Sequence, residues 1–98
     1  MRKIRLVRYS SACPEAYEAY CDDALTAVAN LRLRNGVFTV RCPDYAGVEV
    51  YCSSPRGDGI FEDEQERKIE LQRAVNAIAK YLDKEPEPKL AEYEVTNE

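Results

Sequence analysis

The side chains of this chain that could do chemistry are its carboxylates and thiols, because its 98 residues include no histidine. Without histidine there is no general base that titrates near neutral pH, no Cys–His or Ser–His nucleophile pair and no His-ligated metal. The 18 acidic residues could supply catalytic carboxylate pairs, but those that cluster lie at a polar helix start, where solvated charge is the simpler explanation. No glycine-rich phosphate loop is present. We predict that the protein is not an enzyme and uses no cofactor or metal.

The clustered acidic residues are better interpreted as a surface that binds a partner. Residues 1–42 hold seven basic and four acidic residues, whereas residues 43–98 hold seven basic and fourteen acidic ones, which gives the net charge of −4. An acidic helix start would steer a basic protein partner toward it. The acidic total argues against direct nucleic-acid binding by the whole chain. The predicted acidic contacts are Glu62, Asp63, Glu64, Glu66 and Glu70.

Tyrosine and arginine next to each other on a sheet provide a second candidate surface. Tyr45 is expected at a loop tip, and Tyr51 and Arg41 on the outer face of a predicted hairpin. Tyr and Arg are enriched in binding hot spots, so we include these three among the partner-binding residues. The same face, with Arg32 and Arg34, could instead stack the bases of RNA or single-stranded DNA. In a third interpretation, Tyr51 only pairs across strands or lies under a helix.

The four cysteines show no paired CxxC spacing, so a zinc site is not indicated. Cys42 and Cys52 are expected on one face of a hairpin, two residue pairs apart, which at ~3.4 Å per residue is about 13 Å and too far for a disulfide. Cys21 falls on the apolar stripe of a predicted helix. We interpret these three as buried core thiols. A bridge from Cys13 to Cys42 or Cys52 stays open.

The elements that position these residues centre on a three-stranded meander over residues 31–53. Asn35-Gly36 is the strongest short signal for a two-residue hairpin turn, and it pairs Leu33 with Phe38. A five-residue loop, PDYAG, then leads into the third strand. The expected pairs across this second hairpin are Cys42 with Val48, Arg41 with Glu49, Val40 with Val50, Thr39 with Tyr51 and Phe38 with Cys52.

Two helices are expected to pack on this meander. Residues 3–9 alternate as a strand, and residues 14–29 follow helical spacing after Pro14. The second helix is expected over residues 61–82, capped by Asp58 and ended by Pro86 and Pro88, with only its second half packed. The prediction is a single α+β domain over residues 1–84 in the order β-α-β-β-β-α. Residues 85–98 form either an edge strand or a disordered tail.

Short motifs in the hairpin and the second helix resemble the antitoxin domain of the HicB family. The matching residues are Gly36, Phe38, Thr39, Val40, Pro43, Asp44 and Gly47, then Glu62, Asp63, Glu64, Tyr81, Leu82, Pro86 and Pro88. They cover about half of the chain. The resemblance implies a partial RNase H-like sheet, no catalysis, and capture of a small basic RNA-cleaving toxin.

We therefore expect a non-enzymatic protein-binding module, a small acidic inhibitor or antitoxin-like protein that captures a basic, nucleic-acid-handling partner. A phage-encoded inhibitor of a host defence nuclease complex, of the anti-CRISPR type, is the alternative within this class. An RNA- or single-stranded-DNA-binding sheet is the alternative outside it. No apolar run approaches the roughly 18 residues of a membrane span and no signal peptide is recognisable, so the cytoplasm is expected. A homodimer is left open.

Overall fold

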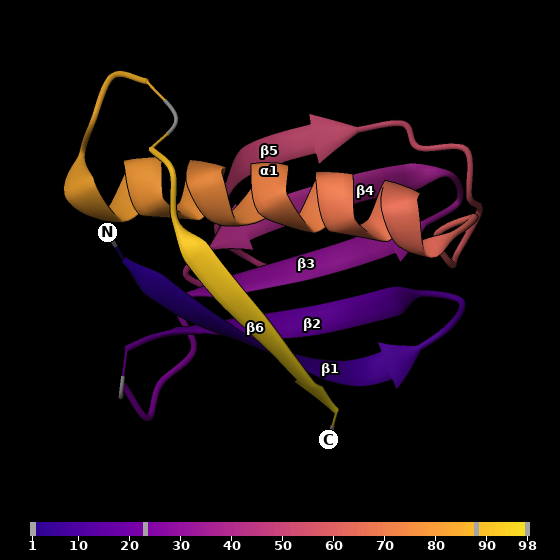
Figure 1. Ribbon diagram of the computed structural model, residues 1–98, viewed down its shortest axis with the longest axis horizontal. Helices are drawn as coiled ribbons and strands as arrows, with labels where there is room; N and C mark the ends of the chain where they lie inside the picture. Colours follow the sequence, from indigo (N-terminus) through magenta and orange to yellow (C-terminus); the bar gives the residue numbers. More distant parts are fainter. Residues whose placement is uncertain (1, 23, 88, 98) are drawn as a thin grey trace.

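A six-stranded sheet with one helix on one of its faces makes up the part of the chain that the computed structural model describes, residues 2–22, 24–87 and 89–97 (Figure 1). The fold is α+β and forms one domain. The elements are β1 (Lys3–Ser11), β2 (Glu15–Cys21), β3 (Ala29–Arg34), β4 (Val37–Cys42), β5 (Val48–Ser53), α1 (Glu64–Asp83) and β6 (Glu92–Asn97). The first five strands form an antiparallel meander, and β6 lies parallel to β1, in the sheet order β5-β4-β3-β2-β1-β6.

The prediction of a helix over residues 14–29 is wrong, because residues 15–21 form the strand β2. Glu15, Tyr17, Ala19 and Cys21 alternate on the helix-covered face of the sheet and are all buried. Pairing with β1 on one side and β3 on the other satisfies the backbone of β2 and overrides its weak helical pattern. Leu25, within the range of that predicted helix, is 96% exposed.

The first hairpin of the meander is confirmed. Leu33 pairs with Phe38 across the turn, and both Asn35 and Gly36 have the positive φ that a type I′ turn requires. Leu31, Leu33 and Phe38 are fully buried in the core beneath α1.

The register of the second hairpin is correct only at its loop end. Arg41 pairs with Glu49 as predicted, but a bulge follows, and Val40 pairs with Tyr51 instead of Val50. A bulge places one extra residue in one strand, so every later side chain of β5 changes face. Tyr51 therefore lies on the covered face against Phe38, and Cys52 is exposed, contrary to its predicted burial.

The helix begins at Glu64, and its N-cap is Asp63, whose carboxylate accepts a 2.8 Å hydrogen bond from the backbone N–H of Glu66. The prediction that Asp58 caps this helix is wrong. The first half of the helix packs as well, because Glu66, Glu70 and Leu71 are buried. Beyond the helix, Pro88 lies outside the described residues, and the chain then forms β6, the strand alternative of the two predicted for this segment.

The two faces of the sheet differ in what covers them. Figure 1 shows α1 lying across the sheet on one side, and no other element among the described residues lies against the opposite side. We call that opposite side the open face. It carries the side chains that alternate with the core residues of each strand, and these include Arg5, Glu18, Arg32, Thr39 and Arg41.

Candidate functional site

Two of the five predicted acidic contacts are buried inside the molecule. The Glu66 carboxylate accepts backbone N–H hydrogen bonds from Arg56 (2.7 Å), Gly57 (3.2 Å) and Glu62 (2.8 Å). Burial alone would raise the pKa of Glu66, but these backbone donors and the Arg56 guanidinium outweigh burial and lower it. Glu66 therefore holds the loop before α1 in place and is not free to contact a partner.

The Glu70 carboxylate is also used for hydrogen bonds within the molecule. Its Oε1 atom accepts hydrogen bonds from the hydroxyls of Tyr51 (2.9 Å) and Ser53 (2.6 Å), both on β5. The hydrogen bond from Tyr51 to Glu70 requires Tyr51 on the covered face of the sheet. The bulge in β5 places Tyr51 there, so the bulge is what allows this hydrogen bond. The prediction that Tyr51 and Glu70 bind a partner is therefore not supported by their positions.

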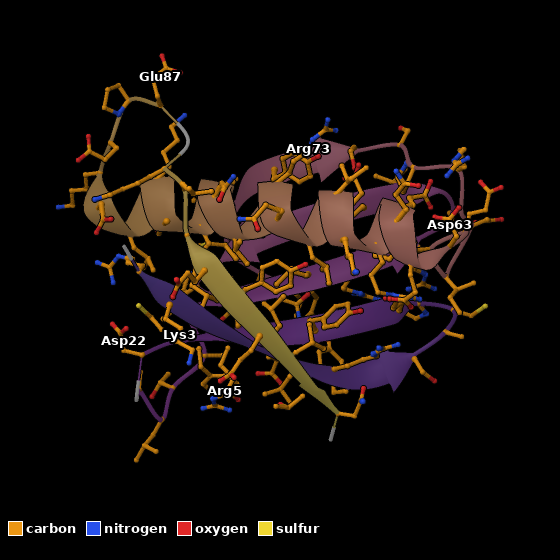
Figure 2. The ribbon with its side chains drawn as sticks, viewed as in Figure 1. Lys3, Arg5, Asp22, Asp63, Arg73 and Glu87 are labelled. Carbon is orange, nitrogen blue, oxygen red and sulfur yellow. The ribbon has the colours of Figure 1, made fainter. Side chains whose placement is uncertain are left out.

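The other three acids, Glu62, Asp63 and Glu64, are exposed, but each is paired with an arginine of the same molecule. Arg56 lies 2.9 Å from Glu62 and 3.3 Å from Asp63, and Arg67 pairs with Glu64. Figure 2 shows Asp63 at the start of α1, beside the loop that carries Arg56. This paired cluster offers a basic partner less negative potential than the sequence alone indicates.

The deepest polar cluster is structural. The Glu15 carboxylate is fully buried and accepts two hydrogen bonds from Arg67, at 2.8 and 3.0 Å, one from the Tyr17 hydroxyl, and one of 3.2 Å from the backbone N–H of Phe61. Burial alone would raise the pKa of Glu15, but the hydrogen bonds from Arg67, Tyr17 and Phe61 lower it overall. Burial and the neighbouring Glu15 carboxylate raise the pKa of Tyr17. A carboxylate so enclosed cannot meet a substrate, so this cluster ties β2 to α1.

The thiols and the metal-ligating side chains make no site together. Cys13 and Cys52 are exposed and Cys21 and Cys42 are buried, and all four are free thiols, so the bridge from Cys13 that the sequence left open is not formed. Burial raises the pKa of Cys42 to about 11, which makes it a poor nucleophile. Over residues 2–22, 24–87 and 89–97, no cluster of three metal-ligating side chains is present. Within the same ranges, no helix is both long and apolar enough to span a membrane.

A basic hollow on the open face brings together two of the predicted contacts, Arg41 and Tyr45. The hollow has a volume of about 320 Å³ and lies over the β3–β4 hairpin. Three arginines dominate its lining, which consists of Arg32, Arg34, Arg41, Asn30, Thr39, Tyr45 and Val37. We refer to these seven residues as the basic hollow. The strand alternation that places Leu31 and Leu33 in the core places Asn30, Arg32 and Arg34 here, and this signal was available from the sequence.

The guanidinium groups in the basic hollow are little used by the protein itself. Within the described part of the chain, neither Arg32 nor Arg34 has a carboxylate oxygen within 4.0 Å. Arg41 has only a 3.9 Å contact with Glu49, and both side chains are about half exposed. The Arg32 guanidinium lies over the Tyr45 ring, 5.8 Å from its centroid, and this contact positions it. These arginines are available to an anionic group from outside.

The remainder of the open face has mixed charge. On β1, the Arg5 guanidinium lies 4.7 Å from the centroid of the Tyr20 ring, and Lys3, Arg5, Asp22 and Glu94 line a second hollow of about 310 Å³. Figure 2 shows Lys3, Arg5 and Asp22 close together at this end of β1. Positive and negative side chains alternate here, so the excess of positive charge is confined to the basic hollow.

Comparison with known proteins gave no match: no family model, no curated protein and no solved structure matches the chain. The resemblance to HicB-type antitoxins therefore stays a prediction.

Proposed function

We propose that the chain is a non-enzymatic protein-binding module that holds its partner on the open face of its sheet. The observation that carries this proposal is the basic hollow, on the face that no helix of the described chain covers. There Arg32 and Arg34, with no carboxylate within 4.0 Å among the described residues, and Arg41, with only a 3.9 Å contact to Glu49, surround the exposed Tyr45. Arg and Tyr are among the residues most enriched in binding hot spots, and a polar rim surrounds the centre of a typical protein interface. An inhibitor or antitoxin-like role in the cytoplasm fits this proposal, because such proteins act by covering a surface of their partner.

The acidic start of α1 is the weaker surface for the same function. Its two central carboxylates, Glu66 and Glu70, are buried, and its exposed carboxylates are paired with Arg56 and Arg67. The cations of a partner that docked there would have to compete with Arg56 and Arg67 for these carboxylates. Capture of a basic partner through this surface is therefore less well supported than docking on the open face.

Single-stranded nucleic acid is a second candidate ligand of the open face. The observation in its favour is the pair of stacked contacts, Arg5 over Tyr20 and Arg32 over Tyr45, because exposed tyrosines with arginines are the groups on which bases stack. Against it, Glu18 and Glu49 lie on the strands that flank the β3–β4 hairpin and would repel a phosphate backbone that crosses the sheet.

The test compares variants of the two surfaces as bait. The open-face variant carries Arg32→Glu and Arg34→Glu, both in the basic hollow, and the matched helix-start variant carries Glu62→Lys and Glu64→Lys. Each is used with the wild-type chain in a quantitative pull-down from the source cell, and binding of a fluorescent oligouridine is measured alongside.

We expect specific protein partners to be lost from the open-face variant and retained by the helix-start variant. Partners lost only from the helix-start variant would instead support the acidic surface predicted from the sequence. Salt-dependent binding of the wild-type chain to oligouridine, without a protein partner, would support the nucleic-acid candidate.

A further inference from the structure

The basic hollow is built from hydrogen-bond donors. Arginine has five N–H donors and no acceptor, so Arg32, Arg34 and Arg41 together present a surface that can only donate. The Thr39 hydroxyl adds a further donor to the lining. One of the two N–H donors of the Asn30 amide is already used, since its Nδ2 donates to the Tyr9 hydroxyl at 2.7 Å. A group that fits this lining must accept several hydrogen bonds and carry negative charge, as a carboxylate does.

The size of the hollow limits what can enter it. Its volume of about 320 Å³ lies at the lower end of the ~300–1,000 Å³ range of small-molecule sites, which is enough for one or two acidic side chains. Arg32 is held over the Tyr45 ring, and the 3.9 Å contact of Arg41 with Glu49 is long enough to be exchanged for a closer carboxylate.

Electrostatics on either side of the hollow favour a protein ligand over a nucleic acid. Glu18 lies opposite Asn30 on the neighbouring strand β2, and Glu49 lies opposite Arg41 on β5. A phosphate backbone has a negative charge at every nucleotide, so it would meet these carboxylates as it left the hollow. A peptide can present its acids only where the arginines are and place neutral or basic residues over Glu18 and Glu49.

We propose that the basic hollow recognises an acidic segment of a partner protein, with one or two Asp or Glu carboxylates bound by Arg32, Arg34 and Arg41. This inference rests on the proposed function, because it names the chemistry of the partner at the same open face. The partner is thus acidic where it docks, which is the reverse of the basic surface expected from the sequence.

The experiment is an NMR titration of the full ¹⁵N-labelled chain at low salt with acetylated, amidated hexaglutamate. The uncharged control peptide is hexaglutamine, and the nucleic-acid probe is a six-nucleotide oligothymidylate. The test variant is Arg32→Gln with Arg34→Gln. The matched control is Arg5→Gln, which removes an arginine from the same face outside the hollow.

We expect hexaglutamate to shift the resonances of β3, β4 and the loop at Tyr45, with hexaglutamine giving no shifts. The double variant should bind at least about tenfold more weakly, as expected for loss of charge-assisted hydrogen bonds, and Arg5→Gln should bind like the wild type. Added salt should weaken the binding.

The inference is overturned if hexaglutamate shifts residues elsewhere or none, if Arg5→Gln weakens binding as much as the double variant, or if oligothymidylate binds more tightly than hexaglutamate. If hexaglutamate fails while the pull-down still depends on Arg32 and Arg34, the proposed function stands and only the acidic-segment inference falls. If the pull-down depends instead on Glu62 and Glu64, the proposed function falls as well.

Discussion

Replacing Glu15 with glutamine should destabilise the fold by about 3 kcal/mol, because its carboxylate is buried and satisfies donors from three parts of the chain. Glutamine keeps one oxygen, which can still accept from the Phe61 backbone N–H. Its NH₂ group faces Arg67 and cannot accept, so one of the two Arg67 hydrogen bonds and the ionic interaction are lost. Removing one partner of a buried ion pair costs about 3–5 kcal/mol, and the lower end applies here because the Arg67 side chain is still 12% exposed to water.

The assay is urea denaturation at pH 7, with the midpoint compared at constant slope. The matched control is Glu18→Gln, a change of the same chemistry on the same strand, at a position that faces the open side of the sheet. We expect the control to stay within about 0.5 kcal/mol of the wild type. A loss below about 1 kcal/mol for Glu15→Gln, or one equal to the control, would refute the structural role assigned to this carboxylate.

The pH dependence gives an independent check of the same residue. The pKa of Glu15 in the folded protein lies below its ordinary value of 4.5, so its charged form stabilises the fold above pH 4.5. That contribution is lost as the pH falls through the lowered pKa. The stability difference between wild type and Glu15→Gln should therefore shrink in acid, below about pH 4. A difference that stays constant from pH 7 to pH 3 would contradict the shift.

Three further predictions concern the loop before α1 and the thiols. Glu66→Gln should lower the free energy of unfolding by about 1–3 kcal/mol in urea denaturation, because three backbone N–H groups lose a charged acceptor, and Glu64→Gln should change it little. Gly57→Ala should lower the free energy of unfolding by about 1–3 kcal/mol or more, because the added Cβ would lie 2.0 Å from the carbonyl oxygen of Ile60. If the variant melts at the wild-type temperature, the loop can adapt to the added methyl group. Two thiols, those of Cys13 and Cys52, should react quickly with a disulfide reagent in the native protein and two only on unfolding, whereas a single fast thiol would place the bulge of β5, which exposes Cys52, in doubt.

The sequence predicted the β3–β4 hairpin correctly because its information there is local. Asn35-Gly36 defines the turn, and strict alternation of Leu33 and Phe38 with polar neighbours defines the two faces. The strand alternative for the C-terminal segment was likewise visible as an alternation, but only pairing with β1 selects it.

The errors have a common physical cause, which is that long-range contacts decide between local patterns of similar strength. Residues 15–21 fit both helical spacing and alternation, and the neighbours β1 and β3 select the strand. The bulge in β5 has no local signal of its own. It follows from the packing of Tyr51 against Phe38 and its hydrogen bond to Glu70, a residue of α1 that only the folded chain brings near.

Long-range contacts also explain why the structure favours the open face as the binding site, whereas the sequence favoured the acidic helix start. A charged side chain is available to a partner only if it is not already paired with a charge of its own molecule. The sequence shows which residues are charged, but not which of them form ion pairs in the folded chain. In the folded chain the carboxylates of Glu66 and Glu70 accept from backbone and hydroxyl donors, and Arg56 pairs with the exposed Glu62 and Asp63. The arginines of β3 have no such role, since the strands they belong to are held by backbone pairing and by the core beneath. Charge that the fold does not use is the charge that a partner can bind, and in the basic hollow that charge is positive.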